Sequence, residues 1–219
     1  MRIPLLLLLL VIRPAASAAA DSTPPGDPIV TWMDPADPSV AAIRRVGEPA
    51  IARLGSTLIY EVERTIADKG LAGAVDVLHL KNLALPKPVP GQPRVTAIKR
   101  TSLLIRNPDN APDAADRAAL EKIKAALDEG TDVPKLLIQR LDRPALAPEW
   151  RVYQPISTQP QCVKCHGSAE SLPPEVQAAI TRRFPGDQAV GYSLYSWRGV
   201  IRLSLVAPES TVPVKPKSP

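Results

Sequence analysis

The sequence predicts an α+β domain in which an antiparallel sheet is flanked by helices and preceded by a long N-terminal helix. Helix-like and strand-like segments are grouped along the chain, whereas a parallel α/β sheet would need them to alternate strictly. The chain has 219 residues, a length that suits one domain with its own hydrophobic core. We expect that domain to occupy residues 39–207.

The long N-terminal helix is expected from Val40 to about Lys69. Its apolar residues recur at three-and-four spacing, which places them on one face of a helix. Gly70 ends the pattern, because glycine after the last periodic residue is a common helix stop. A shorter helix is expected from Leu71 to about Leu83. The apolar residues of the first helix include Ile43, Val46, Ala50, Leu54 and Leu58.

The rest of the domain is expected to supply the sheet. Short segments rich in β-branched and aromatic residues, bounded by proline, glycine or asparagine, predict strands. Residues 196–199 are expected to join the last two strands as a hairpin turn. The expected strands are 94–105, 135–141, 149–156, 191–195 and 200–207, and the expected helices are 114–129 and 174–182.

Both ends of the chain are expected to lie outside the domain. Residues 1–20 resemble a secretory signal peptide, because Arg2 precedes a short apolar run that small residues follow. That run is shorter than the roughly 20 residues of a membrane-spanning helix, and no later run approaches that length. The mature protein is therefore expected in the periplasm without an integral membrane segment. The proline-rich leader 21–38 and tail 208–219 are expected to be disordered.

The stretch Cys162-Val163-Lys164-Cys165-His166 contains both cysteines and one of the two histidines of the chain. C-x-x-C-H is the attachment signature of haem c: two thiols form thioethers with the haem, and the histidine becomes an axial ligand of the iron. The alternative is a structural zinc site in which His79 joins the motif side chains. Consecutive Cys165 and His166 disfavour it, because both cannot readily reach one tetrahedral metal. The motif predicts one covalent haem per chain.

Other function classes find little support in the sequence. The formal net charge is +5, but basic residues are scattered among acidic ones, so no nucleic-acid surface is expected. No Ser/His/Asp arrangement, phosphate-binding loop or pair of catalytic carboxylates is recognisable. An enzyme is therefore not expected, although an open haem can support peroxidase-type chemistry.

Several further stretches carry a combined pattern: 73–77, 100–112, 153–156, 162–167, 184–192 and 197–199. Together they resemble the Tll-type single-haem c proteins, a former domain-of-unknown-function family whose fold resembles PAS sensor domains. The resemblance runs from about Gly47 to Val206 in the expected order. It implies a PAS-like antiparallel sheet that holds one haem c, with His166 as the proximal ligand.

The resemblance also exposes a departure at the distal axial ligand. In the family pattern that ligand is a cysteine in the second helix, and the aligned residue here is Leu78, which cannot bind iron. His79 is the remaining histidine, and neutral imidazole is a good iron ligand, so a bis-histidine haem is one expectation. Met33 is a softer alternative. Otherwise the sixth position is open to water or a small gas.

Other side chains are candidates for contacts with the porphyrin. Arg100 and Arg106 carry guanidinium groups that pair well with propionates, although either could instead be a solvated charge at a strand edge. Tyr192, Tyr195 and Trp197 could pack on the ring or belong to the ordinary core of the sheet.

We therefore expect an exported single-haem c-type protein for electron transfer or haem-based redox sensing. The alternative is a gas-binding haem sensor with an open sixth position. No kinase or cyclase segment is recognisable in the chain, so signalling would need a separate signalling protein, and electron transfer would need a redox partner protein.

Overall fold

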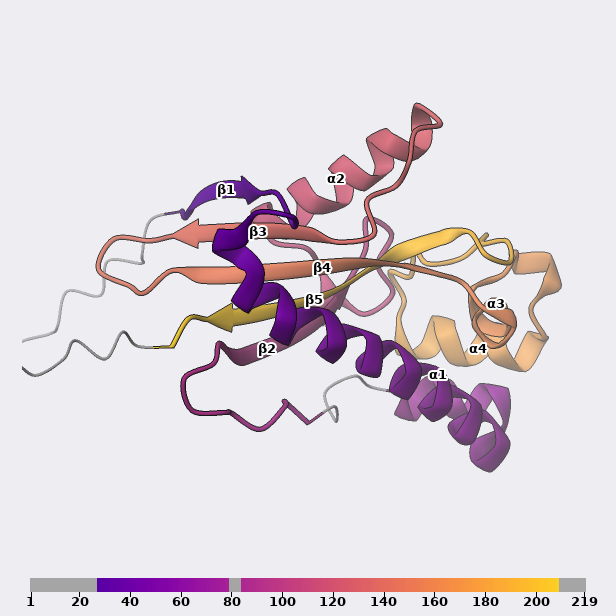
Figure 1. Cartoon of the computed structure of the whole chain (residues 1–219). Helices are drawn as coiled ribbons and strands as arrows, with labels where there is room; N and C mark the ends of the chain where they lie inside the picture. Colours follow the sequence, from indigo (N-terminus) through magenta and orange to yellow (C-terminus); the bar gives the residue numbers. More distant parts are fainter. Residues whose placement is uncertain (1–26, 79–83, 209–219) are drawn as a thin grey trace, which may run out of the picture.

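The computed structural model describes residues 27–78 and 84–208. Its centre is a five-stranded antiparallel sheet with the strand order β1-β3-β4-β5-β2 (Figure 1). This architecture confirms the predicted α+β class and is consistent with a PAS-like arrangement. The strands are β1 (Ile29–Met33), β2 (Arg94–Thr101), β3 (Leu137–Asp142), β4 (Glu149–Ser157) and β5 (Trp197–Val206).

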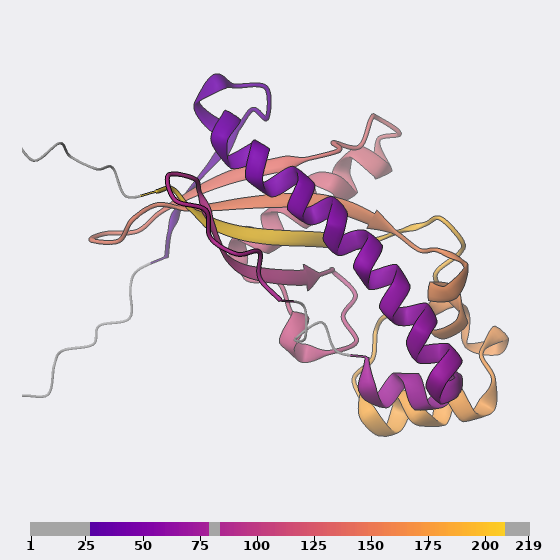
Figure 2. The same cartoon turned by 60° about the horizontal axis from the view of Figure 1, so that its bottom comes forward.

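The long helix α1 (Ala41–Val77) crosses one face of the sheet, as Figures 1 and 2 show. Its inner face buries Ile51 and Leu54 in a core shared with Val152 and other apolar residues of the sheet. Gly47 allows the close approach, because a Cβ atom there would lie 3.0 Å from a methyl carbon of Val152. The predicted amphipathic helix therefore forms and packs on the sheet through its apolar face.

Helix α1 is interrupted at Gly70, where φ is 70° and ψ is 173°. Only glycine adopts this backbone conformation readily, so the predicted helix stop is confirmed. The second segment ends at Val77, and Leu78 already has the extended values φ −72° and ψ 96°. The predicted continuation of this helix beyond Leu78 is therefore wrong at that residue, and His79 lies outside the described residues.

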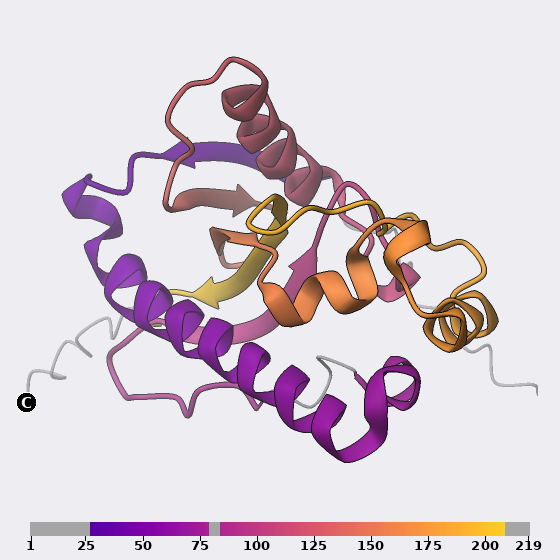
Figure 3. The same cartoon turned by 90° about the vertical axis from the view of Figure 1, so that its right-hand side faces the viewer.

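Helix α2 (Ala114–Asp128) packs on the opposite face of the sheet from α1 (Figure 3). Leu120 and Ile123 are fully buried in a second apolar cluster, which also contains Tyr153 of β4. The Asp113 side chain accepts a hydrogen bond from the backbone of Asp116, so the helix begins with a capping box. The sheet thus lies between α1 on one face and α2 on the other.

A charged network ties α2 to the sheet. Asp116 is fully buried, and its carboxylate pairs with Lys99 Nζ at 3.1 Å and with Arg151 at 3.1 Å. The Tyr153 hydroxyl donates to the same carboxylate at 3.2 Å, and Arg151 also pairs with Asp113 at 2.7 Å. A buried charge is tolerated when it is paired and hydrogen-bonded, as here.

Two further helices lie at the end of the sheet where β4 finishes and β5 begins. They are α3 (Pro160–His166) and α4 (Pro174–Arg183). Helix α4 runs beside the last part of α1, where Val176 and Ile180 share a third apolar cluster with Val75 (Figures 1 and 2). Short 3₁₀ helices occur at Pro38–Val40, Pro108–Asn110 and Ala169–Ser171.

The leader was predicted to be disordered throughout, and this is wrong for Ile29–Met33. These residues form β1, which pairs with β3 along its whole length. The run Ile-Val-Thr-Trp-Met has the β-branched and aromatic composition of a strand, and it finds an open edge of the sheet. Residues 1–20, expected as a signal peptide, and residues 209–219 of the tail lie outside the described residues. Within the described ranges, no helix has the length and apolar character needed to cross a membrane.

The hairpin predicted for residues 191–207 does not form. Only its second strand exists, as β5, whereas residues 191–195 are irregular. Gly191 and Tyr195 have positive φ values of 80° and 63°, which are incompatible with a regular strand. The backbone N–H groups of Gly191 and Tyr192 donate instead to the carbonyls of Gly167 and His166. This segment therefore bonds to the end of the C-x-x-C-H motif and adds no strand to the sheet.

Candidate functional site

A cavity of about 680 Å³ lies between α1, α3 and the segment that follows β2. Its volume falls within the roughly 300–1,000 Å³ of ordinary ligand and cofactor pockets. Leu58, Val62 and Ile66 line it from α1, and their spacing of four residues places them on one face of that helix. The side chains of the C-x-x-C-H motif line the same cavity, so the structure joins residues that are a hundred positions apart in the sequence.

The motif forms a short helix, α3. Cys162 and Cys165 are three residues apart, so the helix places both thiols on one side. Helix α3 ends at Gly167, whose N–H donates to the carbonyl of Val163 at 2.9 Å. A Cβ atom at position 167 would lie only 2.7 Å from that same oxygen. The glycine after the motif is therefore required by the tight end of the helix.

The imidazole of His166 is oriented by one hydrogen bond. Its Nδ1 atom lies 2.7 Å from the carbonyl oxygen of Ala189, and a carbonyl only accepts, so Nδ1 carries the proton. The lone pair of Nε2 is therefore free, as in metal-binding histidines. Burial, assisted by the charges of Arg106 and Arg198, holds the pKa of His166 well below its usual 6.5. The ring is neutral at physiological pH and suited to bind iron.

The two cysteines are free thiols that are partly buried at the cavity. Cys165 also packs against the apolar cluster formed by α4 and the end of α1. Burial raises the pKa of its thiol. Both thiols are thus free to react with a group bound in the cavity.

The zinc alternative gains no support from the structure. Among residues 27–78 and 84–208, no group of three or more His, Cys, Asp or Glu side chains could hold a metal ion. The motif side chains therefore do not converge on one tetrahedral centre, and His79 lies outside the described part of the chain.

Arg100 lines the cavity, as expected for a partner of a carboxylate. Burial, and then the nearby charge of Arg198, lowers the pKa of Arg100 to about 10, so it remains charged at neutral pH. In the described part of the chain its guanidinium makes no hydrogen bond or ion pair. A desolvated cation without a partner is costly, and a bound carboxylate would supply the missing interactions.

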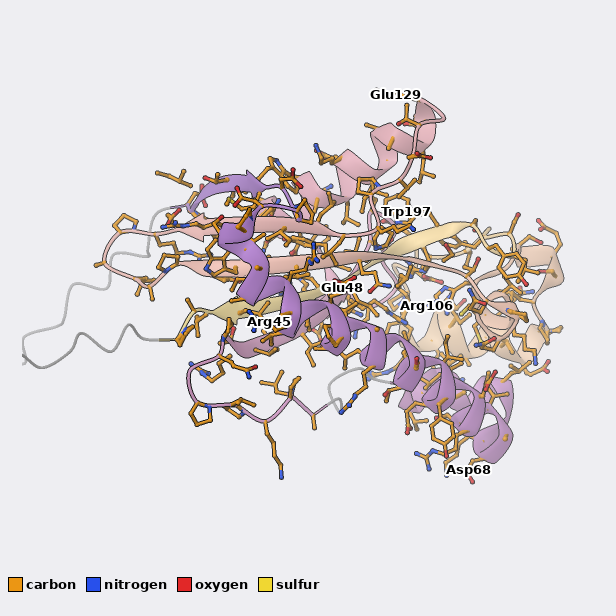
Figure 4. The ribbon with its side chains drawn as sticks, viewed as in Figure 1. Arg45, Glu48, Asp68, Arg106, Glu129 and Trp197 are labelled. Carbon is orange, nitrogen blue, oxygen red and sulfur yellow. The ribbon has the colours of Figure 1, made fainter. Side chains whose placement is uncertain are left out.

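Arg106 was considered both as a propionate partner and as a solvated charge at a strand edge; its burial makes the second wrong, and since it lines the cavity the first stays a prediction. It follows β2, lies between the end of the sheet and the helices α3 and α4, and has a side chain only 12% exposed (Figure 4). Its Nη2 atom donates to the carbonyl of Cys165 at 2.6 Å, to Asp187 at 3.0 Å and to the carbonyl of Ala189 at 3.2 Å. Nη2 is therefore engaged within the protein, whereas Nε is buried and has no hydrogen-bond partner among the described residues.

Arg198 is a third arginine at the cavity, and no sequence pattern singled it out. It donates to the carbonyl of Leu104 at 3.1 Å, and its guanidinium lies 4.9 Å from the ring centroid of Tyr192. Only the long-range fold brings it beside Arg100. It is the middle residue of the Trp-Arg-Gly stretch 197–199 that contributed to the resemblance, and that stretch was the one available signal.

The aromatic candidates do not line the cavity among the described residues. Tyr192 packs edge-to-face against His166, with ring centroids 6.3 Å apart, and this contact helps to hold the imidazole in place. Tyr195 is 65% exposed, and Trp197 packs beside the cluster under α2. Direct contact of Tyr192 with a porphyrin stays a prediction, and the contact that the structure shows is with the histidine.

The structure places the candidates for the distal ligand position differently relative to the cavity. Leu78 lines the cavity, and its correspondence to a distal ligand position stays a prediction. Met33 lies in β1, pairs with Ile138 and packs against the core beneath α1, so the methionine alternative is wrong. His79 follows Leu78 directly in the sequence and lies outside the described residues.

The comparison with protein families agrees with the resemblance. Residues 87–205, more than half of the chain, match the model of the Tll0287-like family. Among solved structures, the chain is similar to the crystal structure of the cyanobacterial haem protein Tll0287 at 22% sequence identity and a TM-score of 0.38. That similarity covers 72% of this chain and 96% of the other. A search of curated proteins found no match.

Proposed function

The chain belongs to the Tll0287-like family, and we propose that it is an exported single-haem c protein. One observation carries the proposal: Cys162, Cys165 and His166 line the same cavity of about 680 Å³. The hydrogen bond from Nδ1 of His166 to Ala189 leaves Nε2 free to act as the proximal ligand. Covalent haem of this kind is attached outside the bacterial cytoplasm, so the proposed location is the periplasm.

The two thiols would attach the haem by addition. Each S–H adds across one vinyl group, so that a sulfur–carbon bond forms and the hydrogen passes to the other vinyl carbon, with no net oxidation. Helix α3 contributes by holding Cys162 and Cys165 three residues apart on one side. His166, the next residue, is then close to the attachment points by covalent connection.

The remaining cavity wall suits the two parts of a haem. The apolar residues Leu58, Val62 and Ile66 offer surface for the macrocycle. Arg100 offers a propionate a guanidinium that pairs with no described residue, and Arg198 adds positive charge beside it. We therefore assign Arg100 as the first propionate partner.

A bound haem supplies a one-electron Fe(III)/Fe(II) couple. The residues of this chain hold it, orient His166 and cover it with apolar side chains, and these are the tasks of a carrier or a redox sensor. We propose electron transfer or redox sensing, with a separate redox or signalling protein as the partner.

The sixth coordination position separates two versions of this function. Leu78 lines the cavity and directly precedes His79 in the sequence, and this closeness along the chain favours a bis-histidine haem. The second version is a gas-binding sensor with an open sixth position. It is favoured by the described cavity lining, in which His166 is the one histidine and methionine does not occur.

Covalent attachment is tested by expressing the chain with a c-type maturation system and extracting it with acidified acetone. Wild type should keep its haem, Cys162→Ser and Cys165→Ser should each weaken attachment, and the double variant should lose all of it. Lys164→Ala is the matched control, because Lys164 lies within the motif but is exposed. Haem that resists extraction from the double variant would contradict the proposal.

A further inference from the structure

The carbonyl oxygen of Ala189 accepts hydrogen bonds from two functional side chains. Nδ1 of His166 lies 2.7 Å away, and Nη2 of Arg106 lies 3.2 Å away. The same Nη2 pairs with Asp187 at 3.0 Å. We propose that the Arg106–Asp187 pair adjusts, through this shared carbonyl, how strongly His166 donates to the iron, and so sets the reduction potential. The inference rests on the proposed haem, and both members of the pair are positioning residues.

The shared carbonyl is fixed in place by the segment 187–192, which we name the proximal strap. Asp187 uses its second carboxylate oxygen to accept from the N–H of Ala189 at 2.8 Å, so one side chain holds both the arginine and the strap backbone. Three other backbone bonds fasten the strap, from Gln188 to Ile105, from Gly191 to Gly167 and from Tyr192 to His166. The Ala189 carbonyl therefore has little freedom to turn away.

The pair lies where charge has a strong effect. The side chains of Arg106 and Asp187 are only 12% and 8% exposed, so solvent and salt screen them weakly. Arg106 also donates to the carbonyl of Cys165, which directly precedes the ligand. The guanidinium is thus bonded both to the carbonyl of the residue before His166 and to the carbonyl that accepts from its imidazole.

The direction of the effect follows from elementary electrostatics. A strong hydrogen bond from Nδ1 makes the imidazole a better electron donor, which favours Fe(III). Arg106 draws on the same carbonyl and so weakens that bond, and its positive charge favours Fe(II), the less positive state of the iron. Asp187 opposes both effects of the arginine. The two residues should therefore shift the potential in opposite directions.

The test is a redox titration of the haem-loaded protein with mediator dyes, in which one electron passes between dye and iron. Arg106→Gln should favour Fe(III) by about tenfold and Asp187→Asn should favour Fe(II) by about tenfold, each equivalent to about 59 mV for a one-electron couple. Arg106→Lys keeps the charge and should restore most of the wild-type value. The exposed pair Arg140–Asp142 of β3 supplies matched controls, because Arg140→Gln and Asp142→Asn should leave the potential unchanged.

A second measurement uses the ¹⁵N chemical shifts of the His166 imidazole in the haem-free chain. Arg106→Gln should strengthen the Nδ1 hydrogen bond and move the Nδ1 signal, whereas Arg140→Gln should not. Potentials that move in the same direction in Arg106→Gln and Asp187→Asn, or that do not move, would overturn the inference. A wild type without haem would instead contradict the proposed function, and the nitrogen shifts alone would then decide whether the carbonyl is shared.

Discussion

At the residue scale, the site depends on a histidine whose two ring nitrogens have different tasks. Nδ1 of His166 donates to the backbone carbonyl of Ala189, and Nε2 keeps a lone pair that can bind a metal. The motif side chains were predictable because their chemistry is contiguous in the sequence. Ala189, which orients the ring, was not, because its contact uses a backbone carbonyl 23 residues further along the chain. A carbonyl carries no residue-type signal, so only the fold reveals it.

The distal ligand gives the first residue-scale prediction. If His79 completes a bis-histidine haem, ferrous wild type should bind carbon monoxide slowly, because the gas must displace an imidazole. His79→Ala should then bind it at least about tenfold faster, as the sixth position is open. Stopped-flow spectroscopy after mixing with carbon monoxide measures both rates. Fast binding by wild type would rule out the bis-histidine haem and favour the gas-binding alternative.

At the element scale, the helices of the core and the edge strand β2 were predictable, and the edge strand β1 was not. The face of α1 follows three-and-four spacing, and Gly70 stops the first segment as expected. Strand β1 escaped prediction because prolines surround it and its partner β3 lies more than a hundred residues away. The segment 191–195 has the composition of a strand, but positive φ values at Gly191 and Tyr195 prevent the predicted hairpin. Its backbone instead bonds to the end of the C-x-x-C-H motif.

The ion pair between Asp113 and Arg151, which attaches α2 to the sheet, predicts that the stability of the fold depends on pH. Burial would raise the pKa of Asp113, but hydrogen bonds from Arg151 and from the Asp116 backbone outweigh it and lower the pKa to about 2. A carboxyl whose pKa is lower in the folded state stabilises the fold above its unfolded value of 3.8, and this contribution is lost as pH falls towards 2. Asp113→Asn keeps a helix cap but removes this contribution. Urea unfolding between pH 5 and about pH 2 should therefore show a shallower loss of stability in the variant, and parallel curves would contradict the assignment.

Strand β5 gives a second element-scale prediction. Gly199 has a φ of 143°, and a Cβ atom there would overlap the carbonyl oxygen of Thr101 and lie 2.9 Å from Cβ of Ser102. Gly199→Ala should therefore lower the free energy of unfolding by about 3 kcal/mol or more. Gly186→Ala is the control, because nothing lies within 4 Å of its added carbon. Equal denaturation midpoints for the two variants would show that β5 tolerates the side chain.

At the scale of the whole molecule, the sequence order predicted the class of fold but not the position of the cavity. The cavity is built where the far part of α1, the segment after β2 and helix α3 meet, and no local pattern reports that meeting. Arg100 and Arg198 come together from strands β2 and β5, which are neighbours in the sheet but distant in sequence. The fold thus gives the C-x-x-C-H motif an apolar wall, an oriented histidine and a cation that has no partner among the described residues.

The central claim is that this site holds one covalent haem c at Cys162 and Cys165. The most direct measurement combines the intact mass of the purified wild-type chain with the spectrum of its reduced pyridine haemochrome. The account predicts a chain heavier by the mass of one haem, with the α-band of a c-type haemochrome. An unmodified mass, or a haemochrome without the c-type α-band, would contradict it.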